Sequence, residues 1–239
     1  MKLTGVYDNT VKREGLVPGW GLSIFLELPE KNLLFDTGAD LKVLENNMKE
    51  LELAPSALDY VVLSHPHCDH VGGLSAILTE NSDVEVFLTE EFPDSLKNKV
   101  ENYGADPVII SEPREICDGV WSTGELFGSH KDQILPEQSL VLRSQRGPVV
   151  VSGCAHPGIT EIVRRSKEIT GKSPYLAVGG FHLGTKKEKE VVEIVEQLKG
   201  ESVSRLAPTH CTGQKASNII KDRYGENWLQ FGAGAVLTL

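Results

Sequence analysis

Short apolar runs alternate along the chain with longer segments in which apolar residues recur at helical spacing. The runs predict strands, and the periodic segments predict amphipathic helices. We expect strands over 21–28, 32–35, 59–63, 84–88, 107–110, 116–121, 140–142, 149–151, 175–178 and 203–207, with further strand structure within 228–239. We expect helices over 40–53, 72–80, 93–103, 159–169 and 185–199, and a last helix from Gln214. This alternation is typical of a layered α/β fold.

The stretch 124–139 interrupts the alternation, because it is polar and contains Gly124, Gly128 and Pro136. Glycine and proline break regular structure, so the stretch predicts an irregular, mobile loop over a functional site. His130 lies within it, and an exposed loop histidine is the simpler interpretation of that residue.

The densest cluster of chemically active side chains follows the predicted strand 59–63. His65, His67, Asp69 and His70 stand close together before the next predicted helix, and the chain has only 7 histidines. Neutral imidazole and carboxylate are ligands of borderline metals such as zinc. The cluster therefore favours a metal site over the alternative, a solvated loop that happens to be rich in histidine.

Three more histidines stand at comparable positions: His156, His182 and His210 each lie between a predicted strand and a predicted helix. Layered α/β folds collect their active sites at the carboxyl ends of strands, so these residues are candidates for function. Asp36 follows the predicted strand 32–35 within an Asp-Thr-Gly tripeptide. An aspartic protease needs two such aspartates facing each other. The chain has one copy, so that interpretation requires a homodimer, and no other feature supports it.

Length and charge narrow the class of protein further. A chain of 239 residues is consistent with a single domain over 1–239. Its net charge of −10 disfavours nucleic acid and anionic membranes as partners. The beginning of the chain lacks the apolar core of a secretion signal, and no apolar run is long enough to span a membrane. The 4 cysteines form no Cys-x-x-Cys pair, so we expect reduced thiols and a cytoplasmic protein.

The segment Ser64–Gly73 resembles the HxHxDH signature of the metallo-β-lactamase superfamily. The resemblance implies a four-layer αββα sandwich, an α/β fold that some schemes class as α+β. It implies one metal held by His65, His67 and His156, and a second metal held by Asp69, His70 and His210. It also places Asp36 behind the histidines as a carboxylate that orients the metal ligands rather than binding metal itself.

The chain departs from the family at the end of a strand that carries metal ligands in most members. Most members place a metal-bridging aspartate near the end of the strand that corresponds to 175–178; this chain has no aspartate near Gly180, and the nearest side chain of a metal-binding type is His182. His182 is then a replacement ligand, a catalytic group, or a histidine bonded to the backbone. Cys68 is expected to point away from the metal, and Cys154 and Cys211 are expected to be small buried fillers. Imidazole ligands favour zinc, as one or two ions, with manganese or iron as alternatives.

These residues predict a metal-dependent hydrolase of a small, anionic or phosphorylated molecule, acting through a metal-bound hydroxide. The catalytic residues would be Asp69, which orients the hydroxide or takes its proton, and His182. The segments around His156, His182 and His210 also resemble a subgroup that includes archaeal dihydropterin ribofuranosyl-aminobenzene phosphate synthase-like proteins. That resemblance implies an alternative, a pterin-type transferase in which metal organises a diphosphate leaving group. A non-catalytic metal or ligand sensor is the third hypothesis.

Overall fold

The computed structural model describes residues 1–130 and 133–239, with the side chain of His130 outside the description. The chain forms two compact units. The first unit is Met1–Ser111 together with Gly232–Leu239, and the second is Glu112–Phe231. The expectation of one domain over 1–239 stays a prediction, and the units are described separately below.

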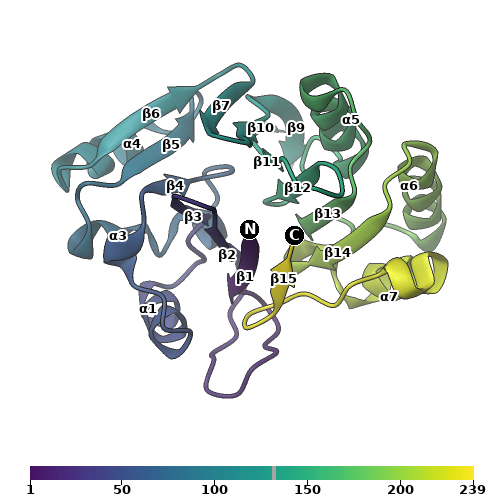
Figure 1. The fold of residues 1–239 in the computed structure, drawn as a ribbon, viewed down its shortest axis with the longest axis horizontal. Helices are drawn as coiled ribbons and strands as arrows, with labels where there is room; N and C mark the ends of the chain where they lie inside the picture. Colours follow the sequence, from purple (N-terminus) through teal and green to yellow (C-terminus); the bar gives the residue numbers. More distant parts are fainter. Residues whose placement is uncertain (131–132) are drawn as a thin grey trace. The chain divides into compact units, whose positions relative to one another are not determined.

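The first unit is built on a seven-stranded sheet in the order β15-β1-β2-β3-β4-β5-β6 (Figure 1). Strands β1 to β3 and β15 pair antiparallel, whereas β3 to β6 run parallel. The strands are β1 (Lys2–Tyr7), β2 (Ser23–Glu27), β3 (Asn32–Phe35), β4 (Tyr60–Val62), β5 (Glu85–Thr89), β6 (Asp106–Ile110) and β15 (Val236–Thr238).

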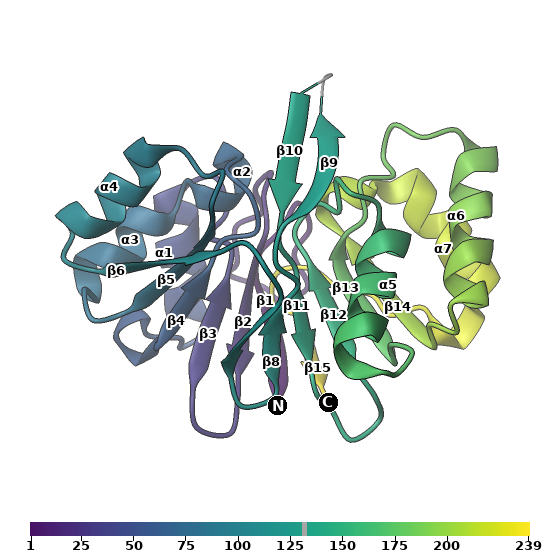
Figure 2. The same cartoon turned by 90° about the horizontal axis from the view of Figure 1, so that it is seen from above.

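Helices α1 (Leu41–Glu50), α3 (Leu74–Glu80) and α4 (Asp94–Asn102) pack on one side of this sheet (Figure 2). Their apolar residues, among them Leu44, Ile77 and Val100, share one core with strand residues such as Leu34 and Val86. The very short helix α2 (Cys68–Val71) carries part of the histidine cluster. The short 3-10 helix η1 (Pro55–Ala57) precedes β4. This unit therefore supplies one sheet layer and one helical layer.

The second unit is built on a six-stranded sheet in the order β14-β13-β12-β11-β8-β7. Strands β12, β13 and β14 run parallel, and the other pairs are antiparallel. The strands are β7 (Arg114–Cys117), β8 (Val120–Ser122), β11 (Leu140–Leu142), β12 (Val149–Ser152), β13 (Leu176–Gly180) and β14 (Arg205–Thr209).

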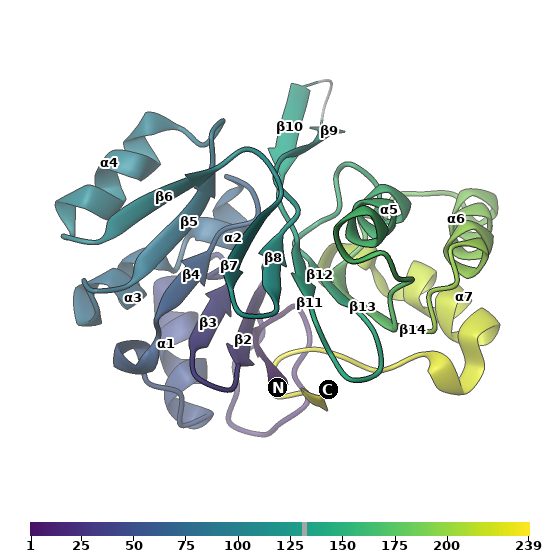
Figure 3. The same ribbon diagram turned by 45° about the horizontal axis from the view of Figure 1, so that its top comes forward.

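Helices α5 (Ile159–Thr170), α6 (Glu188–Gly200) and α7 (Gln214–Tyr224) lie beside the parallel strands of the second unit (Figure 3). Val163, Val195 and Ile220 from these helices pack with Ala177 and Leu206 from the strands. Two short 3-10 helices, η2 (His210–Thr212) and η3 (Gly225–Asn227), flank α7. The second unit therefore combines a six-stranded sheet with a layer of helices, and the prediction of a mixed α/β fold is confirmed.

The prediction of an irregular loop over 124–139 is wrong. This stretch contains β9 (Leu126–His130) and β10 (Gln133–Glu137), which pair antiparallel as a hairpin (Figure 2). Backbone pairing stabilises the hairpin even though its side chains do not alternate clearly between apolar and polar. The expectation of an exposed side chain at His130 lies outside the described residues, as does any mobility of residues 131–132. Within the described residues, no helix is long and apolar enough to cross a membrane.

Candidate functional site

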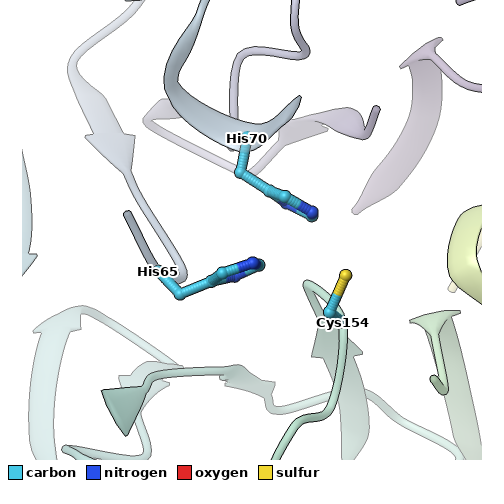
Figure 4. A group of neighbouring side chains, drawn as sticks. All are labelled: His65, His70 and Cys154. Carbon is cyan, nitrogen blue, oxygen red and sulfur yellow. The ribbon is translucent and has the colours of Figure 1, made fainter. Parts of the chain in front are cut away.

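In the first unit the histidine cluster follows the buried end of β4. His65 is fully buried two residues after Leu63, and His67 caps the first turn of α2 in an extended conformation. The His65 Nε2 and His67 Nδ1 atoms lie 3.1 Å apart, and the His65 and His70 ring centroids lie 4.1 Å apart (Figure 4). Helix α2 brings the Asp69 Oδ2 atom to 3.8 Å from His70 Nε2. The nitrogen and oxygen donors of all four residues therefore gather on one short segment.

Asp36 lies behind this cluster at the carboxyl end of β3. Its side chain is fully buried and its φ of 59° is in the left-handed region. One carboxylate oxygen accepts a hydrogen bond from Ser64 N at 2.7 Å, and the other contacts Ser64 Oγ at 2.7 Å and His70 Nδ1 at 2.6 Å. Burial raises the pKa of Asp36, although the contact with His70 opposes the shift. The contact directs His70 Nε2 away from the aspartate, as a ligand-orienting role requires.

In the second unit His156 follows β12 and precedes α5. The backbone reaches it through Ala155, which has a φ of 59°. The His156 Nδ1 atom contacts Glu137 Oε2 at 2.8 Å, and the backbone N–H of His156 donates to the same oxygen at 2.9 Å. The backbone N–H groups of Cys154 and Ala155 donate to Glu137 Oε1, both at 2.8 Å. One buried carboxylate therefore holds the whole turn and orients the His156 ring.

Sequence reasoning missed Glu137. Burial favours the neutral acid, but the hydrogen bonds and charge of His156 outweigh it and lower the pKa of Glu137. The residue stands at the end of β10, inside the stretch predicted to be an irregular loop. Its only signal in the sequence is a charged side chain between Pro136 and Gln138, which does not distinguish it from an exposed loop residue. Pairing with β9 and burial of the carboxylate depend on tertiary contacts.

His182 and His210 follow β13 and β14, and both have left-handed backbones, with φ values of 51° and 49°. Non-glycine residues in this region cost energy and often mark functional sites. The His182 ring lies 4.5 Å from the His156 ring, measured between centroids. A hydrogen bond with the side chain of Cys211 raises the pKa of His182, although partial burial opposes the shift. His210 is buried.

The cysteines near the histidines occupy different environments. Cys68 is exposed, and Cys154 is buried as expected. Cys211 is only partly buried, and its Sγ atom accepts a hydrogen bond from the backbone N–H of His182 at 3.3 Å. Burial would raise the pKa of the Cys211 thiol, but its hydrogen bonds with Cys154 and His182 and the nearby charge of His210 lower it well below its ordinary value. Cys211 therefore differs from the expected buried filler in being partly exposed and hydrogen-bonded.

The donor chemistry of each unit is compatible with a zinc-like metal. Besides the donors of the first unit, two groups in the second unit have all of their potential ligand atoms within 4.8 Å of one another. These groups are Cys154, His156 and His182, and Cys154, His210 and Cys211. Imidazole, carboxylate and thiolate are the ligands that zinc takes in proteins. The residues present could therefore hold a metal ion.

A pocket of about 420 Å³ in the second unit borders two of these histidines. Its wall includes His156 and His182, the first turn of α5, and the cationic side chains of Arg164 and Lys186. Glu161 also lines it, and Arg164 pairs with Glu201 at 2.9 Å, so part of the positive charge is compensated. The lining of the pocket combines apolar residues, among them Phe181, with polar ones.

The model of the metallo-β-lactamase superfamily matches residues 17–210. The chain belongs to the metallo-β-lactamase superfamily. The structure of Tm1679, a metal-dependent hydrolase of that superfamily, aligns with a TM-score of 0.83 at 26% identity, over 100% of this chain and 99% of that one. The predicted fold class is therefore confirmed. The family is one of enzymes, and its members typically bind metal ions.

Two archaeal relatives match almost the whole chain. The 7,8-dihydropterin-6-methyl-4-(β-D-ribofuranosyl)-aminobenzene-5'-phosphate synthase of Methanocaldococcus jannaschii is 29% identical over 92% of this chain and 91% of its own length. An uncharacterized protein of the same organism is 26% identical over 87% of this chain and 90% of its own length. Human tRNase Z, short form, shares the fold at 12% identity with a TM-score of 0.65, over 100% of this chain and 99% of that one.

Proposed function

We propose that this superfamily member is a metal-dependent hydrolase of a small anionic molecule. The observation that carries the proposal is the pocket of the second unit, which places two histidines of the donor groups beside two cationic side chains. The proposed assignment of ligands follows the resemblance to the HxHxDH signature of the family. One metal would be held by His65, His67 and His156, and the other by Asp69, His70 and His210.

A bound zinc ion would lower the pKa of a water molecule to about 7 and so supply a nucleophile near neutral pH. The side chains of the protein orient the metal-binding histidines and accept or hold the proton of the bound water. Asp36 and Glu137 each contact the Nδ1 atom of a histidine, which leaves Nε2 of His70 and His156 as the donor atom. Asp69 offers a carboxylate close to His70 Nε2, where it would accept or hold a proton.

The pocket supports a substrate of limited size and negative charge. Ligand pockets for small molecules commonly have volumes of about 300–1,000 Å³, and this pocket has about 420 Å³. Lys186 lines the pocket beside His182, and its positive charge opposes the rise in the pKa of His182 that the hydrogen bond with Cys211 causes. The first backbone amides of α5 add partial positive charge at the same wall. A phosphate or carboxylate group would satisfy these donors.

A second function is favoured by one observation, the similarity to the archaeal synthase over nearly the full length of both chains. On this alternative the same residues organise a diphosphate leaving group, and the acceptor is an organic molecule instead of water. A sensor that binds metal and ligand without turnover is the third candidate. For each of these functions we propose zinc, with manganese or iron as alternatives, and a cytoplasmic protein that binds neither nucleic acid nor membranes.

The test begins with metal content, measured by elemental mass spectrometry on protein purified without chelator or added metal. The loaded protein is then assayed with phosphomonoesters, phosphodiesters and lactones in water. Turnover that is lost on chelation and restored by zinc is the expected result. A protein that binds metal stoichiometrically and hydrolyses none of these compounds would contradict the hydrolase.

A matched pair of lysine variants tests the pocket. Lys186→Gln should raise KM for an anionic substrate about 5- to 30-fold, as expected for loss of one exposed charge contact worth roughly 1–2 kcal/mol. Lys189→Gln, which removes an exposed lysine that pairs with Glu193 on α6, should leave KM unchanged. Equal effects of both variants would show that general surface charge, and not the pocket, binds the anion.

A further inference from the structure

Gly180, at the end of β13, has no room for a side chain, and the resemblance to the superfamily implies a bridging aspartate near this position. A Cβ atom added at Gly180 would lie 2.3 Å from the carbonyl oxygen of Gly153 and 2.6 Å from the Sγ atom of Cys211. Contacts this short require the backbone or the cysteine to move. A carboxylate at this position would therefore have to displace its neighbours, and the family's bridging ligand needs a substitute.

Cys154 is the side chain of the second unit that reaches both donor groups. Its Sγ atom lies within 4.8 Å of the donor atoms of His156 and His182, and within 4.8 Å of those of His210 and Cys211. The residue is buried, and its sulfur points away from the loop that joins β12 to α5 (Figure 4). Glu137 fixes this loop by accepting the backbone N–H of Cys154 at 2.8 Å.

We propose that the Cys154 thiolate takes the place of the missing aspartate as the ligand shared between the two groups. The inference rests on the metal binding in the proposed function, but not on the reaction catalysed. A bridging ligand must lie within reach of the donors of both metals, and His156 and His210 are assigned to different metals. When metal binds, the thiol proton leaves to solvent and the sulfur donates an electron pair to the ion.

The second cysteine has a different role. The Cys211 Sγ atom accepts the backbone N–H of His182 at 3.3 Å and donates to the carbonyl oxygen of Cys154 at 3.5 Å. These contacts hold Cys211 against the backbone at the end of β13, where it fills the space beside Gly180. Cys211 is therefore a positioning residue for His182 and for the loop of Cys154.

A thiolate in this position restricts the metals that the centre accepts. Soft sulfur ligands select zinc and other thiophilic ions, whereas carboxylate and water suit manganese and magnesium. The proposal therefore predicts that the protein retains zinc or cobalt against dialysis and does not retain manganese. This preference separates a thiolate bridge from a carboxylate bridge without any assay of turnover.

Cobalt substitution tests the proposal directly. Wild-type protein loaded with Co(II) should show the near-ultraviolet charge-transfer absorption of a thiolate–cobalt bond. Cys154→Ser should lose this absorption and retain one metal ion fewer per chain, while Cys211→Ser should keep it. Cys117→Ser, which changes a half-buried thiol on β7, is the matched control and should keep it as well.

Two outcomes would overturn the proposal: wild-type Co(II) protein without thiolate charge transfer, or an unchanged absorption band in Cys154→Ser. A wild-type spectrum without the band refutes the proposal even where a variant fails to fold. Circular dichroism and a second variant, Cys154→Ala, check folding. Failure of the hydrolase proposal is recognised separately, because a protein with the thiolate band can still lack turnover.

Discussion

Replacing Glu137 with glutamine should destabilise the second unit and weaken metal binding together. The carboxylate is buried and accepts four contacts: three backbone N–H groups at 2.8, 2.8 and 2.9 Å, and the His156 ring at 2.8 Å. Glutamine has the same shape, but it offers one acceptor oxygen and one NH₂ group that can only donate. Two of the four contacts are therefore lost, and two buried donors face the NH₂ group.

The expected magnitude follows from that count. A buried donor left without an acceptor costs about 1–3 kcal/mol, so two of them lower the free energy of unfolding by about 2–6 kcal/mol. Loss of the carboxylate also frees the His156 ring to rotate. Removal of such a partner of a metal-binding histidine typically weakens metal binding about 10- to 100-fold.

Urea unfolding of the metal-free protein, followed by circular dichroism, measures the first effect, and competition with a chelator measures the second. Glu115→Gln is the matched control, because that exposed carboxylate accepts a single N–H group, from Gly119 at 3.0 Å. The control should change stability by less than about 1 kcal/mol. If Glu137→Gln unfolds at the same urea concentration as wild type with the same slope, the buried contacts do not contribute as argued.

Three other perturbations have defined outcomes. Asp36→Asn keeps a residue type that tolerates the left-handed backbone, so the protein should fold yet bind zinc about 10- to 100-fold more weakly by competition titration. Burial raises the pKa of Asp59, but the contacts with Lys31 and with a backbone N–H group outweigh burial and lower this pKa below 3.8. The stabilisation from Asp59 is therefore present at neutral pH and is lost as the pH falls through the lowered pKa. Asp59→Asn should therefore reduce stability at pH 7, by no more than about 1 kcal/mol for this partly exposed pair, and the difference from wild type should shrink as the pH is lowered into the acid range. Gly180→Ala should lower the free energy of unfolding by about 1–3 kcal/mol, whereas Gly200→Ala, where an added Cβ meets no atom within 4 Å, should leave it unchanged or slightly raised.

Much of the fold was predictable because local signals agreed with it. The buried run at β4, the histidine cluster and the apolar periodicity of α3 are contiguous in sequence, so their order along the chain already implies strand, ligand loop and helix. The same logic placed His156, His182 and His210 after strands. The parallel pairing of β12, β13 and β14 then puts these three strand ends at one edge of the sheet of the second unit.

The hairpin of β9 and β10 was not predictable, because its strands lack a clear alternation and depend on backbone pairing with each other. The structure identifies Glu137 as the partner of His156, because the hairpin places its carboxylate beside the turn that carries this histidine. A single sequence contains no signal for a contact between residues 19 positions apart in different elements.

The sequence by itself determined which potential metal ligands this protein carries, since imidazole and carboxylate donors at strand ends have the same chemistry in any packing. Tertiary structure decided which carboxylates orient those donors, and at which positions a larger side chain can be accommodated. Burial and close approach are properties of packed elements, as the sulfur of Cys211 beside Gly180 illustrates. From the sequence alone, Cys154 is therefore interpreted as a small buried residue. It becomes a ligand candidate only in the structure, where its sulfur lies close to donor atoms of two groups that contain histidine.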